Sequence, residues 1–332
     1  MAKAVKDIGE IKIGSYLDDV HKPSRSHNGA KTAENLKKIA GITNWGRWGK
    51  NDERGTLNYL TPEVIVQAAR LIKKGKVYSL AIPIERGAPD NNAVRNPLWH
   101  LNMVTQHKGH GTEISNRGSA DDVIIMHTQS TTHVDGLASY WYGGELYNGF
   151  SPDVIDRFGT RRCAVAEMKA IVGRGILLDM ARFLKKDPMP LDYVITPKDI
   201  EACAKAEGVE FRSGDILLFR TGWLKNYFYG TGTKAYYKGH PGTGVDCVRW
   251  LHDHEIVAVG ADTVGVEKVP SEDPQVYLPL HAIYIRDMGG YIMEYFDLDG
   301  LAKDRAYEFF FLAAPLKLKL GLNSPLHPIA IT

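Results

Sequence analysis

Short segments rich in β-branched and aromatic residues constrain the fold of this chain more than any other feature. They are bounded by turn residues, which is typical of strands. Strands are predicted over residues 77–84, 123–127, 176–180, 215–220, 256–260, 282–286, 291–296 and 308–313. Helices are predicted over 62–74, 197–206, 245–254 and 298–305. The first two begin with a threonine cap followed by a proline, a common helix start.

The order of these elements argues against a strictly alternating fold. Strands outnumber helices and do not alternate with them regularly, whereas a doubly wound βαβ fold requires alternation. We therefore expect an α/β (α+β) protein with a mixed, largely antiparallel sheet flanked by helices. Residues 1–60, rich in Gly, Asn, Trp and Lys, are predicted to form an irregular N-terminal arm, and residues 61–332 a single domain.

Composition and charge exclude several classes of protein. The 44% hydrophobic and 24% charged residues are ordinary for a folded soluble chain. The net charge is +2, and the short cluster Lys73, Lys74 and Lys76 suits a solvated helix end, so nucleic-acid binding is not expected. The longest apolar run, 309–316, is too short to span a membrane. Three cysteines without a CxxC pattern favour reduced thiols in a cytoplasmic protein.

Common catalytic and nucleotide-binding motifs are missing from the sequence. It contains no GxSxG elbow, no HExxH and no phosphate-binding Walker loop. The glycines at 230 and 232 lack the third glycine and the helix of a dinucleotide fingerprint. Nucleophilic hydrolases of these types and nucleotide-binding enzymes are therefore disfavoured.

One short segment has the residue types of a metal site. Gln129, His133 and Asp135 are spaced by four and two, so on an extended backbone all three side chains project from one face. An imidazole nitrogen and two oxygens could there bind a cation. A His-x-Asp pair can equally fix a histidine tautomer or cap a turn, and the spacing alone leaves both interpretations open.

The block QSTTHVDGLASYWYGGELYNG, residues 129–149, resembles the signature of the cyclase-like metal-dependent hydrolases. In kynurenine formamidases and isatin hydrolases this signature is HxGTHxDxPxH. A branch that includes trans-dienelactone hydrolase carries a QxxTQxDG-type block instead, and this chain is similar to both. Further matches, which extend the resemblance over about residues 45–332, lie at 173–179, 214–223, 258–262, Glu267, His281, Glu294 and 314–316.

The resemblance implies a swivelling β/β/α-like cyclase fold and a metal site. Gln129, His133 and Asp135 match the family's primary metal ligands. His281 and Glu294 match a distal pair, which completes a second metal site in two-zinc members or lies near the substrate in single-metal members. Taken alone, His281 suits a core histidine equally well, and Glu294 in a strand would ordinarily face solvent.

One position departs from the family pattern. The last histidine of the motif, a proton-transfer group in the family, falls on Ser139. Serine has no useful pKa near neutrality, so another group supplies the base or the activated water suffices. The candidates are His127, His240, His281 and Glu294, and we expect His281 and Glu294, with Ser139 at the altered position, to form the catalytic set.

Other polar and aromatic residues flank the predicted site. Asp262 and Glu267 follow an apolar run, where a carboxylate can reach a cleft but more often caps the loop. Trp141, Tyr142 and His127 lie beside the metal loop and are the predicted substrate-binding residues, although aromatics beside turn glycines are more often core residues.

The resemblance implies a metal-dependent hydrolase, of amidohydrolase or lactonase type, that opens a small cyclic or aryl amide, imide or lactone. Ligands without a thiolate suit zinc or manganese and do not exclude iron, with one or two ions per chain. The alternatives are a metal-assisted lyase or isomerase and a small-molecule binding protein. From the family and the N-terminal arm we expect a homodimer or homotetramer, without nucleic-acid or membrane partners.

Overall fold

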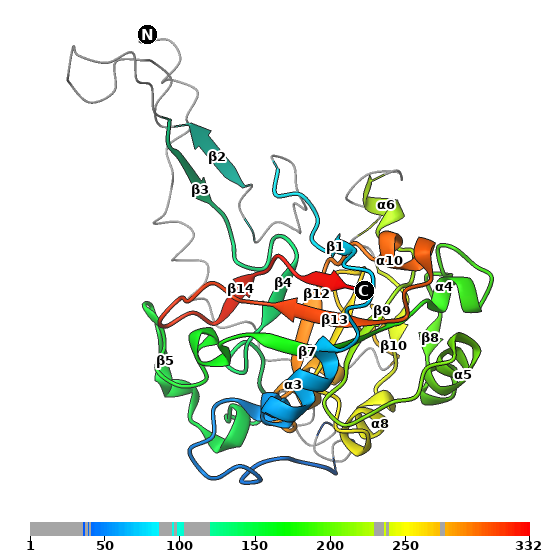
Figure 1. Ribbon diagram of the computed structural model, residues 1–332. Helices are drawn as coiled ribbons and strands as arrows, with labels where there is room; N and C mark the ends of the chain where they lie inside the picture. Colours follow the sequence, from blue (N-terminus) through cyan, green and yellow to red (C-terminus); the bar gives the residue numbers. More distant parts are fainter. Residues whose placement is uncertain are drawn as a thin grey trace, which may run out of the picture.

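Nine strands form one sheet that runs through the middle of the protein (Figure 1). The computed structural model describes residues 36, 39, 41–85, 95, 98–102, 120–228, 236, 239–272 and 276–332. The strands lie in the order β1–β15–β13–β7–β9–β11–β12–β4–β14. In chain order they are β1 (Val77–Ser79), β4 (His133–Asp135), β7 (Ile171–Leu178), β9 (Ile216–Phe219), β11 (Ala258–Ala261), β12 (Tyr291–Glu294), β13 (Glu308–Ala313), β14 (Asn323–Pro325) and β15 (Ile329–Ile331).

The sheet is mixed, as the sequence predicts. Five of its eight neighbouring pairs are antiparallel, and three, β7–β9, β9–β11 and β11–β12, are parallel. Each parallel step contains at least one helix between its two strands, because parallel neighbours need a long crossover connection. The predicted mixed, largely antiparallel sheet is confirmed, while its centre has the helix-connected parallel arrangement.

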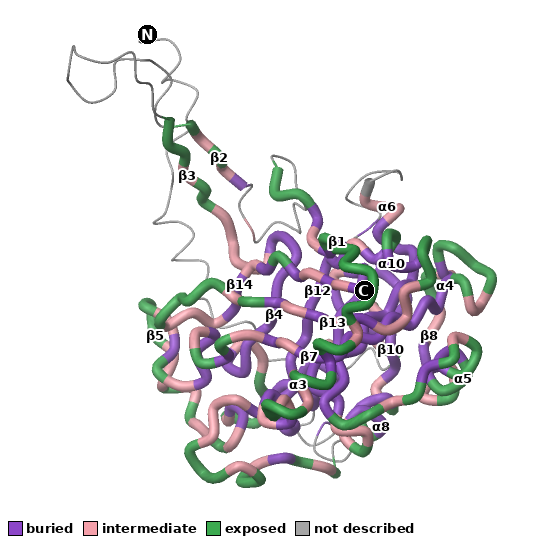
Figure 2. The backbone as a smooth tube through the Cα atoms, viewed as in Figure 1, coloured by how far each residue is buried: buried purple, intermediate pink, exposed green. Residues whose placement is uncertain are grey.

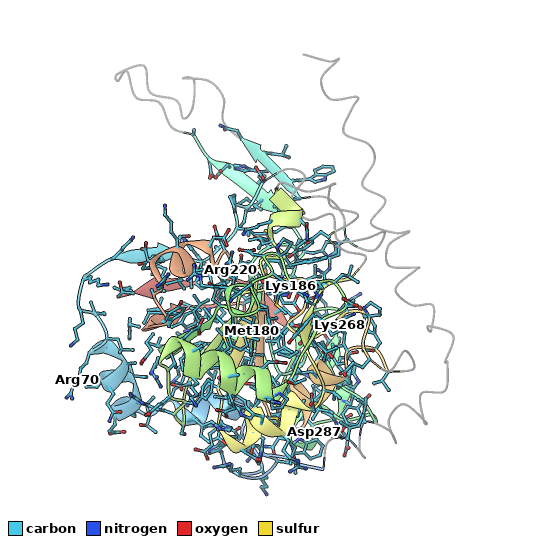
Figure 3. The ribbon with its side chains drawn as sticks, turned by 90° about the vertical axis from the view of Figure 1, so that its right-hand side faces the viewer. Arg70, Met180, Lys186, Arg220, Lys268 and Asp287 are labelled. Carbon is cyan, nitrogen blue, oxygen red and sulfur yellow. The ribbon has the colours of Figure 1, made fainter. Side chains whose placement is uncertain are left out.

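All four predicted helices are present. The helices are α3 (Pro62–Ala69), α4 (Met180–Phe183), α5 (Pro197–Glu207), α6 (Lys225–Phe228), α8 (Cys247–Asp253), α9 (Pro279–Arg286) and α10 (Asp299–Asp304). Helices α5 and α8 lie at the right of the sheet in Figure 1 and face the viewer in Figure 3. Thr196 caps α5 by accepting the N–H of Asp199, whose carboxylate accepts the N–H of Thr196.

Helix α3 starts as predicted but ends earlier than expected. Its cap Thr61 accepts the N–H of Val64, and the helix stops at Ala69 instead of continuing to residue 74. The N–H of Lys74 donates to the carbonyl of Thr332 at 2.9 Å. The chain must leave the helix to make this contact, so pairing with the last strand overrides the helical pattern.

The strand predicted over 282–286 is wrong, because these residues belong to helix α9. All eight residues of α9 are buried, so the segment shows neither a helical nor a strand period. Pro279 stands at the first helical position, and the remote carboxylate of Glu267 accepts the N–H groups of Leu280 and His281. This cap comes from another part of the chain, so the local sequence does not show it.

The other predicted strands are present, most of them with bounds that differ from the prediction. β13 has the predicted limits, β1 is shorter, and β7 begins earlier, at Ile171. The start of β7 contains Gly173 and Gly175, and the predicted strand began only after them. A Cβ at Gly175 would lie 2.2 Å from the ring of Phe309, its cross-strand partner, so the aromatic ring takes the place of a side chain. Strands β14 and β15 were not predicted.

Short elements lie around this sheet. β2 (Trp99–Asn102) and β3 (Asp122–Ile125) form an antiparallel ribbon that extends away from the body (Figure 1) and is mostly intermediate or exposed (Figure 2). After β3 the chain runs through residues 126–132 into β4. Smaller pairs join β5 (Ile155–Asp156) to β6 (Gly159–Thr160) and β8 (Val194–Ile195) to β10 (Gly242–Thr243). Single 3₁₀ turns cover Gly55–Tyr59, Tyr147–Gly149, Pro152–Val154 and Val165–Met168.

Part of the predicted N-terminal arm can be followed against the body. The N–H of Asn44 donates to the carbonyl of Asp287 and the indole N–H of Trp45 to that of Arg286. Gly55 crosses Gly289 so closely that a Cβ on Gly55 would lie 2.0 Å from the Gly289 oxygen. Residues 1–35 lie outside the described residues, and the division at residue 60 stays a prediction.

The core is continuous on both sides of the central strands. Every residue of β9, β11 and β12 is buried, and Figure 2 shows β12 in the buried colour. Such strands lack the alternation of a half-exposed sheet because helices and loops cover both faces. Within the described ranges, no helix is long and apolar enough to cross a membrane.

Candidate metal centre

Two neighbouring strands bring three possible metal ligands together. β4 carries His133 and Asp135, whose side chains face the same side because they are two residues apart. β12 pairs antiparallel with β4 in a register that sets Glu294 opposite His133. One ligand atom from each of the three side chains lies within 4.8 Å of the other two, and all three residues are buried.

The imidazole of His133 has a free nitrogen in this cluster. Its Nδ1 lies 2.8 Å from the carbonyl of Thr131, so Nδ1 carries the proton of the neutral ring. Nε2 is buried without a hydrogen-bond partner, 3.5 Å from Asp135 Oδ1 and 3.3 Å from Glu294 Oε2. A lone pair facing two carboxylate oxygens is stable only with a proton or another cation between them. The residues present therefore fit a divalent metal ion.

The pKa shifts of His133 and Asp135 also indicate that the site favours a positive charge. Burial alone lowers the pKa of His133, but Asp135 and Glu294 outweigh it and raise that pKa above the ordinary value. Burial raises the pKa of Asp135, but the imidazoles of His133 and His281 and the amide of Gln129 outweigh it, and the pKa is lowered. The site favours ionised carboxylates beside a cation.

His281 joins the cluster from helix α9. Its Nε2 lies 3.1 Å from Glu294 Oε1, and its Nδ1 lies 2.5 Å from Glu267 Oε1. Glu294 thus links the two imidazoles, one through each oxygen. Burial lowers the pKa of His281, but Glu267 and Glu294 raise it to about 10. We call His133, Asp135, Glu267, His281 and Glu294 the histidine–carboxylate cluster.

Glu267, for which the sequence analysis favoured a loop cap over a place in a cleft, belongs to the cluster. It caps α9, accepting the N–H groups of Leu280 and His281 at 2.9 and 2.8 Å, and holds the His281 ring. Asp262, which the sequence analysis treated in the same way, accepts instead from Thr221 and Gly222 and organises a loop. The sequence held one signal of this role. Leu278, at the cap position of α9, has no side-chain acceptor, so the cap had to come from elsewhere in the chain.

Gln129 contacts the cluster through its amide nitrogen. Nε2 donates to Asp135 Oδ1 at 2.7 Å, while Oε1 accepts from Arg95 Nη2 at 3.2 Å. The amide oxygen, which is the atom able to bind a metal, therefore faces Arg95. This arrangement suits a hydrogen-bond donor that orients Asp135, and the role of Gln129 as a ligand stays a prediction.

Ser139 lies in the turn that follows β4. Its hydroxyl donates to the carbonyl of Gly136 at 2.7 Å, and its N–H donates to the same carbonyl at 3.0 Å. These bonds tie the side chain to its own turn. The catalytic role of Ser139 stays a prediction.

The two predicted substrate-binding aromatic residues lie in different surroundings. Trp141 is 40% exposed, whereas the hydroxyl of Tyr142 donates to Asp287 and its ring lies against Arg286. The adjacent Tyr140 instead packs against His281, with ring centroids 5.9 Å apart. Tyr140 was missed because a run of aromatic residues does not show which ring turns toward the site.

Two further histidines were candidates for the base. His127 is half-buried, and burial together with Arg95 lowers its pKa. His240 is buried, its Nδ1 lies 3.0 Å from the carbonyl of Pro241, and burial lowers its pKa to about 4. A Cβ on Gly265 would lie 3.6 Å from both the His240 and His281 rings. Of the four candidates, His281 and Glu294 are the ones in the histidine–carboxylate cluster.

Comparisons with known proteins identify the family and the fold of this chain. The Cyclase family model, described as "Putative cyclase", matches residues 77–268, more than half of the chain. A solved structure described as a novel cyclase is 37% identical, covers 88% of this chain and 100% of its own, and superimposes with a TM-score of 0.81. The swivelling cyclase fold that the resemblance implied is thereby confirmed.

Isatin hydrolases are also similar to this chain. The isatin hydrolase of Roseibium aggregatum is 24% identical over 250 residues, 73% of this chain and 84% of that protein. An isatin hydrolase solved with the product analogue thioisatinate is 20% identical, covers 82% of this chain and 99% of its own, and has a TM-score of 0.57, which shows a shared fold. From the family match, the shared fold and the residues at 129–149, this chain belongs to the cyclase family.

Proposed function

We propose that the protein is a metal-dependent hydrolase that opens a small cyclic amide, imide or lactone, or an aryl amide, by adding water to its carbonyl carbon. One observation carries this proposal: the buried Nε2 of His133 has no hydrogen-bond partner and faces oxygens of Asp135 and Glu294. The similarity to isatin hydrolase supports the choice of a cyclic substrate.

His133, Asp135 and Glu294 are the residues that would hold the ion. One nitrogen and two carboxylates without a thiolate suit zinc or manganese. Such an ion lowers the pKa of water and polarises a carbonyl oxygen. Burial of the three side chains excludes bulk solvent and strengthens each charge interaction.

The other residues of the cluster position and move protons. Glu267 accepts from His281 Nδ1, which fixes the ring and presents Nε2 toward Glu294 Oε1. A proton can pass between these two atoms, so the pair can receive it from water and deliver it to the leaving nitrogen or oxygen. Tyr140 forms a wall beside His281 against which a flat ring can pack.

The test combines metal analysis with product mass. The protein, His133→Ala and the control His252→Ala, a partly exposed histidine that pairs with Asp253, are loaded with zinc or manganese and assayed on isatin, a lactone and an aryl formamide. We expect one or two bound ions and a product heavier by one water for the parent and the control, with both lost in His133→Ala.

Other results would overturn the proposal. A metal-free parent after reconstitution would remove its basis. Bound metal without turnover of any substrate would indicate a binding protein, and a product of unchanged mass would indicate an isomerase.

A further inference from the structure

Arg95 places a positive charge beside the histidine–carboxylate cluster. Its guanidinium donates to the backbone carbonyl of Gln129 at 2.7 Å and to the side-chain Oε1 of Gln129 at 3.2 Å. Both acceptors are neutral, and among the described residues no Asp or Glu forms an ion pair with it. By contrast, Arg220 pairs with Asp179, Asp187 and Asp299.

A single side chain connects the Arg95 guanidinium to one of the candidate metal ligands. The side chain of Gln129 bridges the gap, accepting from Arg95 through Oε1 and donating to Asp135 through Nε2 at 2.7 Å. Only one carboxamide therefore separates Arg95 from Asp135. A substituent on a small ring that reacts at the cluster can therefore come within reach of the guanidinium.

Tyr277 is an exposed residue that is linked to His281 through Tyr140. Its side chain is 71% exposed, and its backbone carbonyl accepts the hydroxyl of Tyr140, the ring that packs on His281. Burial raises the pKa of Tyr277, Glu294 and Glu267 raise it further, and Arg95 acts in the opposite direction. The carboxylates of the cluster and the Arg95 guanidinium therefore both contribute to the electrostatic potential at its hydroxyl.

We propose that Arg95 is the subsite for an anionic substituent, so that the preferred substrates are cyclic amides or lactones that carry a carboxylate. The fork of guanidinium donors matches a carboxylate in geometry as well as charge. Gln129 occupies part of the fork, and the remaining N–H groups can serve the ligand. This substrate class rests on the proposed hydrolase function.

The experiment compares matched charged and neutral probes on the metal-loaded protein. Binding of isophthalate and of its neutral diamide is measured by calorimetry, and hydrolysis of isatin and of isatin-5-carboxylate is measured as kcat and KM. The variants are Arg95→Gln and Arg95→Lys. Arg70→Gln is the control, because Arg70 is exposed and projects away from the body in Figure 3.

We expect Arg95→Gln to weaken isophthalate binding and to raise KM for isatin-5-carboxylate, each about tenfold or more, with kcat changed less than about threefold. The neutral diamide and isatin should be unaffected. Arg95→Lys should restore part of the binding, because it keeps the charge without the fork. The control should match the parent throughout.

Two outcomes would overturn the subsite. Equal losses for the charged and neutral probes would show that Arg95 does not recognise charge. A loss of bound metal in Arg95→Gln would show that it acts by holding Gln129 and Asp135.

Failure of the subsite is distinguishable from failure of the hydrolase proposal. If no compound is hydrolysed but isophthalate binding still depends on Arg95, the anion subsite stands and the hydrolase proposal falls. If isatin is hydrolysed and Arg95→Gln changes KM equally for isatin and isatin-5-carboxylate, the hydrolase proposal stands and the subsite proposal falls.

Discussion

Two clusters of acidic side chains, each with at least one buried carboxylate, satisfy the same electrostatic requirement in different ways. Arg220, which follows β9, binds Asp179, Asp187 and Asp299 at 2.9, 2.8 and 2.7 Å (Figure 3 labels Arg220). We call these four residues the arginine cluster. In the histidine–carboxylate cluster, no Lys or Arg of the described chain pairs with Asp135, Glu267 or Glu294.

The difference accords with a structural role for the arginine cluster and with the metal site proposed at the histidine–carboxylate cluster. Burying carboxylates is costly unless a cation compensates them. The arginine cluster carries its own permanent cation, and its carboxylates outweigh burial to raise the pKa of Arg220. The histidine–carboxylate cluster has only imidazoles, which can exchange a proton for a metal ion. A permanent guanidinium in the same place would compete with the proposed metal ion for the carboxylates.

Removing the cation of the arginine cluster should have the largest effect on stability. Arg220→Met leaves Asp179, which is 0% exposed, without its buried partner. We expect the free energy of unfolding to fall by about 3–5 kcal/mol, measured by urea denaturation. Arg182→Met is the control, since Arg182 also pairs with Asp179 but is exposed, and it should cost less than about 1 kcal/mol. Equal losses would contradict the comparison.

Removing the ion from the histidine–carboxylate cluster should have the next largest effect. With metal at about one hundred times its dissociation constant, binding stabilises the folded state by about 2.7 kcal/mol. A chelator should therefore lower Tm in calorimetry, and added zinc or manganese should restore it. In His133→Ala the chelator should leave Tm unchanged. A chelator effect that persists in this variant would place the ion elsewhere.

Raising the pH should weaken the region of the arginine cluster through Glu207. Its Oε1 accepts the N–H of Asp179, and burial is the main cause that raises its pKa from 4.5 to about 7. Since the folded pKa lies above the unfolded one, stability present below pH 4.5 is lost as pH rises through about 7. This change in pKa corresponds to about 3 kcal/mol, and because Glu207 is only partly buried we expect a loss of about 2 kcal/mol in urea denaturation.

The Glu207 effect can be isolated with two variants. Glu207→Gln should flatten this part of the stability profile, because the amide does not ionise. Glu210→Gln, at an exposed position just beyond helix α5, should keep the profile of the parent. An unchanged profile in Glu207→Gln would contradict the assignment.

The smallest expected effect comes from Glu267, which positions His281. Glu267→Gln keeps an oxygen for the cap of α9 but removes the charge beside His281 Nδ1. We expect kcat to fall about tenfold with KM and metal content unchanged. Asp262→Asn is matched in burial but contacts only the loop at Thr221 and Gly222, so it should lower Tm and leave kcat per folded molecule unchanged. A fall in kcat for both variants would indicate a general structural effect.

The sequence by itself determined most of the elements and the central pair of the site. Proline starts with threonine caps predicted α3 and α5, and β-rich runs predicted the central strands. The two-residue spacing predicted that His133 and Asp135 share a face of an extended segment. These features depend on neighbouring residues, and local chemistry decides them.

Only the tertiary structure decided how distant residues complete the site. The register of β12 against β4 set Glu294 opposite His133, and the fully buried α9 carried no period that could distinguish it from a strand. The placement of Glu267 and Arg95 beside the cluster depends on packing between segments remote in the chain. Spacing along the sequence holds no record of such contacts, because burial and pairing select the partners only when the chain folds.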